Sequence, residues 1–248
     1  MKTPVIATVL FAITIPAIAQ NPRLRVTTES TTGGAGQIRV RNLSTVPLRA
    51  VHLHLVCPTG IINVDHDPLV NYGAYTVGES GDDLILPLSV QRMNCSSEID
   101  GAIFQDGYME GSSDRVTDMI AWRRGVSLAL ADAIPVFEGI ADGSILPGAA
   151  IDQLRSRSFS TRMNTARAAG EREAYGYICG KMIGVIQTGF TFRVPTDSTA
   201  HHVPGVQKLM ESGTLTKDQA VAKVTLSKIA EWQMDLRAAG VVTDASQS

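Results

Sequence analysis

The chain has 248 residues, of which 44% are hydrophobic and 19% charged, a composition typical of a globular protein and not of a disordered one. Its formal net charge is −2, and this balance excludes a dominant nucleic-acid partner, which would require a clear basic excess. Aromatic residues make up 5% of the chain, too few to predict a stacking surface for sugars or bases.

The first 19 residues predict a signal peptide. Lys2 supplies a positive charge, residues 5–15 form an uncharged apolar run, and Ala17-Ile18-Ala19 is a small-x-small cleavage signal. The apolar run is too short to span a bilayer, and the chain becomes polar at Gln20. We therefore expect an exported protein, periplasmic or secreted, whose mature chain begins near Gln20.

Residues 20–108 predict an antiparallel β-sandwich made of short strands. Apolar and polar residues alternate over 38–41 and again over 48–55, where His52 and His54 share the face opposite to the apolar one. Residues 84–90 predict a further strand, and Pro87 indicates that this strand lies at a sheet edge. Residues 99–104 predict the last strand of this half.

Three cysteines remain after removal of the predicted signal peptide. Cys57 and Cys95 lie in the same strand-rich half, and in an oxidising compartment we predict a disulfide between them. Closing a loop of this length stabilises the fold by about 3–4 kcal/mol. Cys179 is left over in an apolar helical segment, either as a buried inert thiol or as one end of an intermolecular bridge.

The strand-rich half resembles an immunoglobulin-like domain of the bacterial secreted type. The resemblance rests on the turn-forming segment 42–47 between alternating strands and on the pair Cys57 and Cys95, and it covers about a third of the chain. The strand end at 101–107, which leads into helices, is also similar to secreted bacterial proteins with such an N-terminal domain. The resemblance implies an immunoglobulin-like fold and bacterial export, but no activity. Both tryptophans, Trp122 and Trp232, fall outside this half, unlike the core tryptophan of true immunoglobulin domains.

Residues 109–242 predict an α-helical domain, followed by a disordered tail at 243–248. Apolar residues recur at steps of three and four over 116–137, with Ser112 or Ser113 as the N-cap. Further helices are expected over 149–169, 171–187 and 206–211, with a loop at 195–204, and Thr216 to Gln219 form a capping box that opens a last long helix. The expected fold class is therefore α+β, with the β-sandwich first and the helical domain second.

Gly176, Gly180 and Gly184 recur at every fourth position of one predicted helix. Each glycine inside a helix costs about 1 kcal/mol relative to alanine, so three of them indicate a packing role. We predict that they let another helix of the same domain come close. Membrane insertion or self-association through this face is the alternative, and Lys181 in the middle of the segment disfavours insertion.

The sequence contains no motif that specifies a catalytic, cofactor or metal site. There is no HExxH or paired-cysteine pattern, no nucleophile elbow and no phosphate-binding glycine loop, so we predict no catalytic residue, no cofactor and no metal. If a metal were bound, the candidate ligands are His52 and His54, which project from one face of a strand, and His66 in a predicted loop.

These observations favour an exported, non-enzymatic module that binds a protein or envelope partner or has a structural role. An extracytoplasmic hydrolase with its site between the two halves, metal-dependent through the histidines, is the first alternative. An envelope-associated protein that uses the glycine helix is the second. The substrate, the partner and the oligomeric state do not follow from the sequence.

Overall fold

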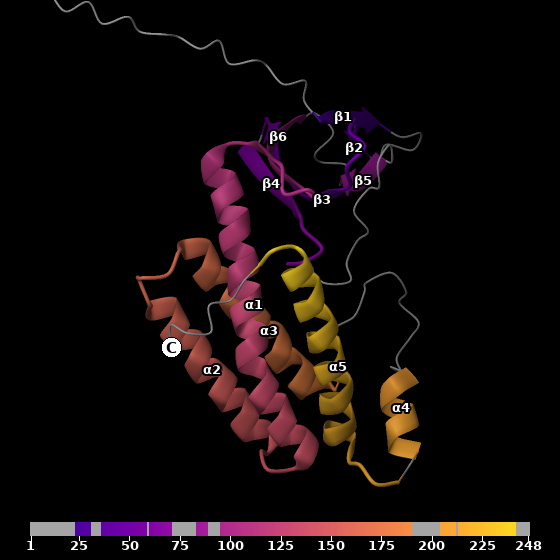
Figure 1. Cartoon of the computed structure of the whole chain (residues 1–248), viewed down its shortest axis with the longest axis vertical. Coiled ribbons are helices and arrows are strands. Elements are labelled where there is room, and N and C mark those ends of the chain that lie inside the picture. Colours follow the sequence, from indigo (N-terminus) through magenta and orange to yellow (C-terminus); the bar gives the residue numbers. More distant parts are fainter. Residues whose placement is uncertain are drawn as a thin grey trace, which may run out of the picture.

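A computed structural model describes residues 23–30, 36–58, 60–70, 83–88, 95–189, 204–211 and 213–241. The predicted signal peptide, the tail at 243–248 and nearly all of the loop at 195–204 lie outside these residues. The described chain is a mixed α+β structure in which two antiparallel sheets precede five helices (Figure 1). We call residues 23–111 the β half and residues 113–241 the helical half.

The β half consists of two antiparallel sheets. The first has the order β1 (Leu24–Ser30), β2 (Gly36–Asn42) and β5 (Asp83–Leu88). The second has the order β4 (Gly60–His66), β3 (Leu48–Cys57), β6 (Ser96–Phe104) and β7 (Met109–Gly111). Pro87 lies on β5 at a sheet edge, as predicted, because proline has no N–H to donate to a second neighbouring strand.

The two sheets share one hydrophobic core. Alternate residues of β3, Val51, Leu53 and Leu55, are fully buried in it together with Ile38 from β2 and Phe104 from β6. The predicted disulfide between Cys57 and Cys95 is present and lies at the edge of this core. The disulfide joins the end of β3 to the start of β6, two neighbouring strands of the second sheet.

The helical half consists of α1 (Ser113–Asp142), α2 (Pro147–Met163), α3 (Ala169–Thr188), α4 (Pro204–Glu211) and α5 (Lys217–Ala238). The long helix α1 begins beside the sheets and continues through the helical half (Figure 1). Ser112 caps its N-terminus by accepting a hydrogen bond from the Arg115 N–H, and the predicted capping box of Thr216 and Gln219 opens α5.

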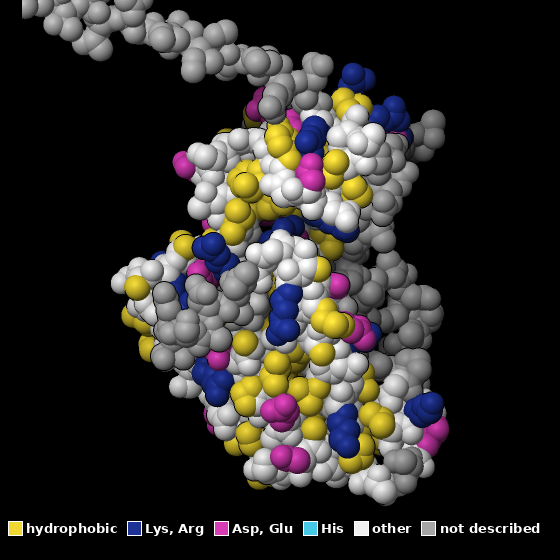
Figure 2. Space-filling view, in the orientation of Figure 1, with side chains coloured by type: hydrophobic (Ala, Val, Ile, Leu, Met, Phe, Trp, Pro, Cys, Tyr) yellow, Lys and Arg dark blue, Asp and Glu magenta, His cyan; other side chains and the backbone are white. Residues whose placement is uncertain are grey.

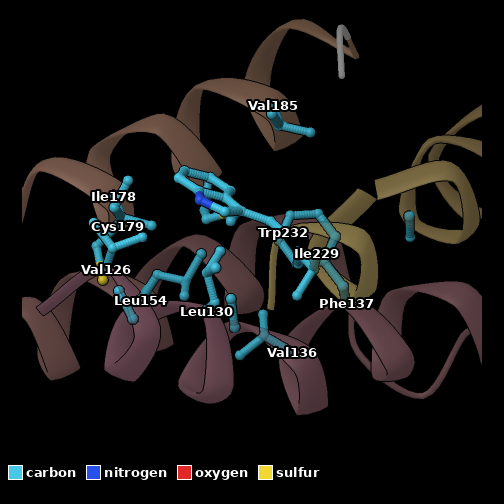
Figure 3. Close-up of a cluster of buried hydrophobic side chains, with 14 of the residues drawn as sticks. Val126, Leu130, Val136, Phe137, Leu154, Ile178, Cys179, Val185, Ile229 and Trp232 are labelled. Atoms are coloured by element: carbon cyan, nitrogen blue, oxygen red, sulfur yellow. The ribbon is translucent and has the colours of Figure 1, made fainter. Parts of the chain in front are cut away.

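A single hydrophobic core fills the space between α1, α3 and α5, and α2 also contributes to it. Trp232 is 1% exposed and lies among aliphatic side chains of the neighbouring helices (Figure 3). This core is separate from the core of the two sheets. Of the part of the chain that the structure describes, no helix has both the length and the apolar character that a membrane span requires.

Several boundaries differ from those expected from the sequence. Residues 109–111 form β7 and pair with β6, so the strand-rich half extends beyond the predicted boundary at 108. Asp65 and His66, expected in a loop, belong to β4. Gly170, expected to end the second helix, lies in the first turn of α3, because the helical pattern stops at Met163 and resumes at Ala169.

The glycines at 176, 180 and 184 all lie on α3, but their surroundings differ. A Cβ atom added at Gly176 would lie 2.5 Å from Nε of Arg162, whereas one added at Gly180 or Gly184 would meet no described atom within 4 Å. α1 and α3 come close at Gly125 of α1, where an added Cβ would lie 2.2 Å from the carbonyl oxygen of Glu171. Close packing of α3 against α1 therefore depends on Gly125 of the facing helix and not on Gly180 or Gly184.

Candidate functional site

A cleft of about 340 Å³ lies between the β half and the helical half. It is lined mainly by polar and aromatic side chains from β3, β4, the segment after β4, α1 and α3, namely His52, Asn63, Asp65, His66, Asp67, Arg115, Asp118, Trp122, Glu173 and Tyr177, with Val51, Val70 and Met119 as the apolar part. On the face shown in Figure 2, a constriction separates the two halves, and basic side chains lie along it.

The β-half side of the cleft is built around His52. Because β3 residues alternate between the two faces of the sheet, Val51 and Leu53 enter the sheet core while Ala50, His52 and His54 face the helical half. Ala50 packs with Ile103 of β6 and Met119 of α1 in a small hydrophobic cluster that joins the halves. His52 is therefore 0% exposed, although the alternation of the sequence places it on the polar face of the strand.

A carboxylate holds the ring of His52 in place. Asp65 lies directly opposite His52 in the register of β3 and β4, and its Oδ1 is hydrogen-bonded to Nδ1 of His52. The other ring nitrogen, Nε2, is buried and makes no hydrogen bond to any described residue. The ring of His54 lies edge-on to that of His52, with 5.5 Å between the ring centroids.

A β-bulge brings a second carboxylate to these histidines. His52 pairs with Gly101 and Leu53 pairs with Ile99, so Asp100 is the extra residue on β6. Ile99 and Ala102 both pack in the sheet core although three positions separate them, which strict alternation does not permit. The bulge turns Asp100 towards the histidines, and its Oδ2 lies 3.9 Å from Nε2 of His52 and 3.8 Å from Nδ1 of His54.

Hydrogen bonds connect the N-terminus of α1 to Asp100. Arg115 donates from Nε to Asp100 Oδ2 at 3.0 Å, and Ser112 donates from its hydroxyl to Oδ1 at 3.2 Å. Burial alone would raise the pKa of Asp100, but these two hydrogen bonds and the electrostatic effects of His54 and Arg115 lower the pKa below its ordinary value. Asp100 is therefore a carboxylate at neutral pH.

A buried ion pair connects the segment after β4 to α1. Nε of Arg123 donates to Oδ2 of Asp67 at 2.7 Å, and both side chains are less than one-tenth exposed. Asp67 Oδ1 also accepts from the Leu69 N–H, and the Leu69 carbonyl accepts from Nε1 of Trp232 at 2.7 Å. These bonds join the segment after β4 to α1 and α5.

The helical side of the cleft combines carboxylates with aromatic rings. Asp118 and Trp122 are one turn apart on α1, and α3 approaches them at Gly170, where an added Cβ would lie 2.4 Å from Oδ1 of Asp118. The rings of Trp122 and Tyr177 are edge-to-face, with 6.4 Å between centroids. Nζ of Lys181 lies 4.7 Å from the centroid of the Tyr177 ring.

The structure brings together part of the set of candidate residues. His52 and His54 lie beside each other with Asp100, whereas His66, although it lines the cleft, does not belong to this group. Asp65 and Asp100 read as polar turn or strand-end residues in the sequence, and no sequence signal marks the bulge that repositions Asp100. Arg115, Asp118, Trp122 and Tyr177 lie on the predicted helices, but their convergence with the histidines depends on how the halves pack.

Cys179, the third cysteine, is free and 1% exposed in the core of the helical half. Burial raises the pKa of its thiol to about 11, and the nearby Asp132 also contributes to this increase. A thiol with this pKa is almost entirely protonated at neutral pH, so Cys179 lacks the character of a nucleophile.

Comparison with known proteins finds no family model, no curated protein and no solved structure that matches this chain.

Proposed function

We propose that this is an exported binding protein whose ligand is a small organic cation held in the cleft between the two halves. The proposal of export rests on the predicted leader at 1–19 and on the Cys57–Cys95 disulfide, a bond that persists mainly in oxidising compartments. The final location is then the periplasm or the extracellular medium.

An immunoglobulin-like architecture for the β half belongs to the same proposal. Two antiparallel sheets around one core support it. The disulfide departs from the immunoglobulin pattern, because it joins neighbouring strands of one sheet and not the two sheets. The cleft proposal does not depend on this classification.

The observation that carries the proposal is the combination of acidic and aromatic side chains in the cleft. Its volume is within the range of small-molecule sites, and it lies at an interface between halves, where such sites are common. Asp65, Asp118 and Glu173 are all more than one-third exposed, and of the described residues that line the cleft only Arg115 is a lysine or an arginine. This surplus of negative charge favours a cation.

The aromatic rings complete the recognition of such a ligand. A cation over the face of tryptophan or tyrosine is stabilised by about 0.5–2 kcal/mol, depending on how far it is desolvated. The ammonium of Lys181 already lies over the Tyr177 ring, so this ring can face a positive charge, and a ligand cation on the same ring face would compete with Lys181. Trp122 lies beside it and lines the same cleft.

Calorimetric titration with choline and with its neutral isostere 3,3-dimethylbutan-1-ol tests the proposal. We expect choline to bind and the isostere to bind at least tenfold more weakly, because only choline carries the charge. Trp122→Leu is expected to weaken choline binding about 3- to 30-fold, the equivalent of the cation–π energy. Glu173→Gln should weaken it as well.

Glu138→Gln is the matched control, because Glu138 is an exposed carboxylate on α1 that does not line the cleft. It should leave choline binding unchanged. Equal binding of choline and the isostere, or equal effects of Glu173→Gln and Glu138→Gln, would overturn the proposal.

A metal-dependent hydrolase is the second candidate function, and the group of His52, His54 and Asp100 at the end of the cleft favours it. A hydrolase would turn over p-nitrophenyl esters or phosphate esters in the presence of zinc and lose this activity in His54→Ala. The binding proposal expects no turnover with either class of substrate.

A further inference from the structure

We infer that His52, His54 and Asp100 form a binding site for a divalent transition-metal ion of the zinc type. One ligand atom from each residue, a ring nitrogen from each histidine and a carboxylate oxygen from Asp100, lies within 4.8 Å of the other two. Imidazole and carboxylate ligands suit zinc and its neighbours in the first transition row. The site shares His52 with the lining of the cleft, whereas His54 and Asp100 lie outside that lining. The variants of the choline test, Trp122→Leu and Glu173→Gln, leave all three proposed ligands in place.

The environment of His52 supports the metal site independently of the spacing of the three ligand atoms. Its Nε2 is fully buried and has no hydrogen-bond partner among the described residues, which is unfavourable for a polar atom. The lone pair of a neutral imidazole at this position is available to a metal ion. A bound metal would thus satisfy an atom that the described residues leave without a hydrogen-bond partner.

Asp65 supplies the outer support that metal-binding histidines commonly have. A ligating histidine usually donates its second ring N–H to a carboxylate or carbonyl, which sets the tautomer and the ring orientation. The bond between Nδ1 of His52 and Asp65 is of this kind. It places the proton on Nδ1 and leaves Nε2 directed towards Asp100.

The spacing of the ligand atoms requires a small contraction on metal binding. Zinc–nitrogen and zinc–oxygen bonds of about 2.0–2.1 Å in tetrahedral geometry separate ligand atoms by about 3.3 Å. The separations from Asp100 Oδ2 to the two histidine nitrogens are 3.9 and 3.8 Å. These two separations must shorten by about 0.5–0.6 Å, and the two histidine nitrogens, which lie within 4.8 Å of each other, must also move to tetrahedral spacing. The three protein ligands leave a fourth position for water or another ligand.

Arg115 is the main opposing group, because its Nε already donates to Asp100 Oδ2. A metal ion at this oxygen would compete with the guanidinium. Arg115 has a second carboxylate partner, because its terminal nitrogen also donates to Asp118 at 3.3 Å. The arginine can keep this second partner while the metal takes its place at Asp100.

Titration of the full mature chain, prepared without a polyhistidine tag, with Co²⁺ followed by visible absorption, and then displacement by Zn²⁺, tests the site. We expect one metal ion per chain. His54→Ala removes a ligand whose side chain is one-third exposed, so the loss leaves no buried cavity, and we expect at least tenfold weaker binding. His202→Ala removes one of the three histidines outside the proposed group and should change nothing.

Asp65→Asn tests the positioning role of the second carboxylate. Loss of such an outer partner typically weakens metal affinity about 10- to 100-fold, while the ligand set itself is unchanged. Circular dichroism of each metal-free variant verifies that it is folded. The absence of stoichiometric binding, or equal effects of His54→Ala and His202→Ala, would overturn the proposal. Metal binding that persists unchanged in Asp65→Asn would overturn the role of Asp65.

Discussion

Asp67→Asn should strongly destabilise the protein, because it leaves the guanidinium of Arg123 buried without a counter-ion. The side chains of Arg123 and Asp67 are 4% and 8% exposed, so water cannot replace the lost carboxylate. The substitution keeps the shape of the side chain and an oxygen that can accept the Leu69 N–H. The substitution thus removes the charge and replaces one of the two oxygens that accept from Arg123 by an N–H donor.

The expected loss is about 3–5 kcal/mol in the free energy of unfolding, which is typical when one partner of a buried ion pair is removed. No other carboxylate among the described residues lies within 4 Å of Arg123, so the charge has no alternative partner. Asp152→Asn is the control. Asp152 and Arg155 form an ion pair on α2 with 79% and 60% exposure, and breaking it should cost less than about 1 kcal/mol.

Urea unfolding followed by tryptophan fluorescence measures these differences, because Trp122 and Trp232 both lie in the helical half. The double variant Asp67→Asn with Arg123→Met removes both charges and keeps an apolar chain in place of the arginine stem. It should be more stable than the sum of the single effects predicts, with a coupling of about 1–3 kcal/mol. A loss below about 1 kcal/mol in Asp67→Asn, or additive single effects, would refute this reasoning.

Two further predictions concern α3 and its neighbours. Gly180→Ala should stabilise the protein by about 0.4–1 kcal/mol, because an added Cβ meets no described atom within 4 Å. Gly125→Ala should destabilise the protein, because its Cβ would clash with the Glu171 carbonyl. Urea unfolding measures both effects, and a destabilised Gly180→Ala variant would contradict the reasoning. Cys179 should react with Ellman's reagent only after unfolding, because burial raises the pKa of its thiol to about 11 and leaves about one thiolate in a thousand at pH 8. Reaction of the native protein within minutes would show that the thiol is accessible.

Local features of the sequence predicted most of the secondary structure. The capping box at Thr216 and the edge position of Pro87 both follow from the hydrogen-bonding capacity of one or two residues, and the structure confirms them. The pair Cys57 and Cys95 was predictable because two cysteines in one strand-rich half have few other partners. β4 was missed because Asp65-His66-Asp67 has the composition of a turn.

The candidate site could be predicted only in part. The spacing of His52 and His54 places both on one face of a strand, which the alternation of a strand dictates. The burial of His52 does not follow from this spacing, because the covering atoms come from another element. Asp100 joins the histidines through a bulge, and a bulge shifts the alternation by one residue without a distinct sequence pattern.

The sequence by itself determined the order of a strand-rich half and a helical half, their turns and caps, and the disulfide, because these depend on neighbouring residues or on simple periodicity. Tertiary structure alone decided that the beginning of α1 packs against the second sheet, and residues on both sides of this contact line the cleft. It also decided which glycines permit close helix packing, since Gly125 faces the backbone of α3 whereas Gly180 faces no described atom. The physical reason is that a site of this kind is made of contacts between residues distant in the chain, and such contacts depend on how whole elements pack.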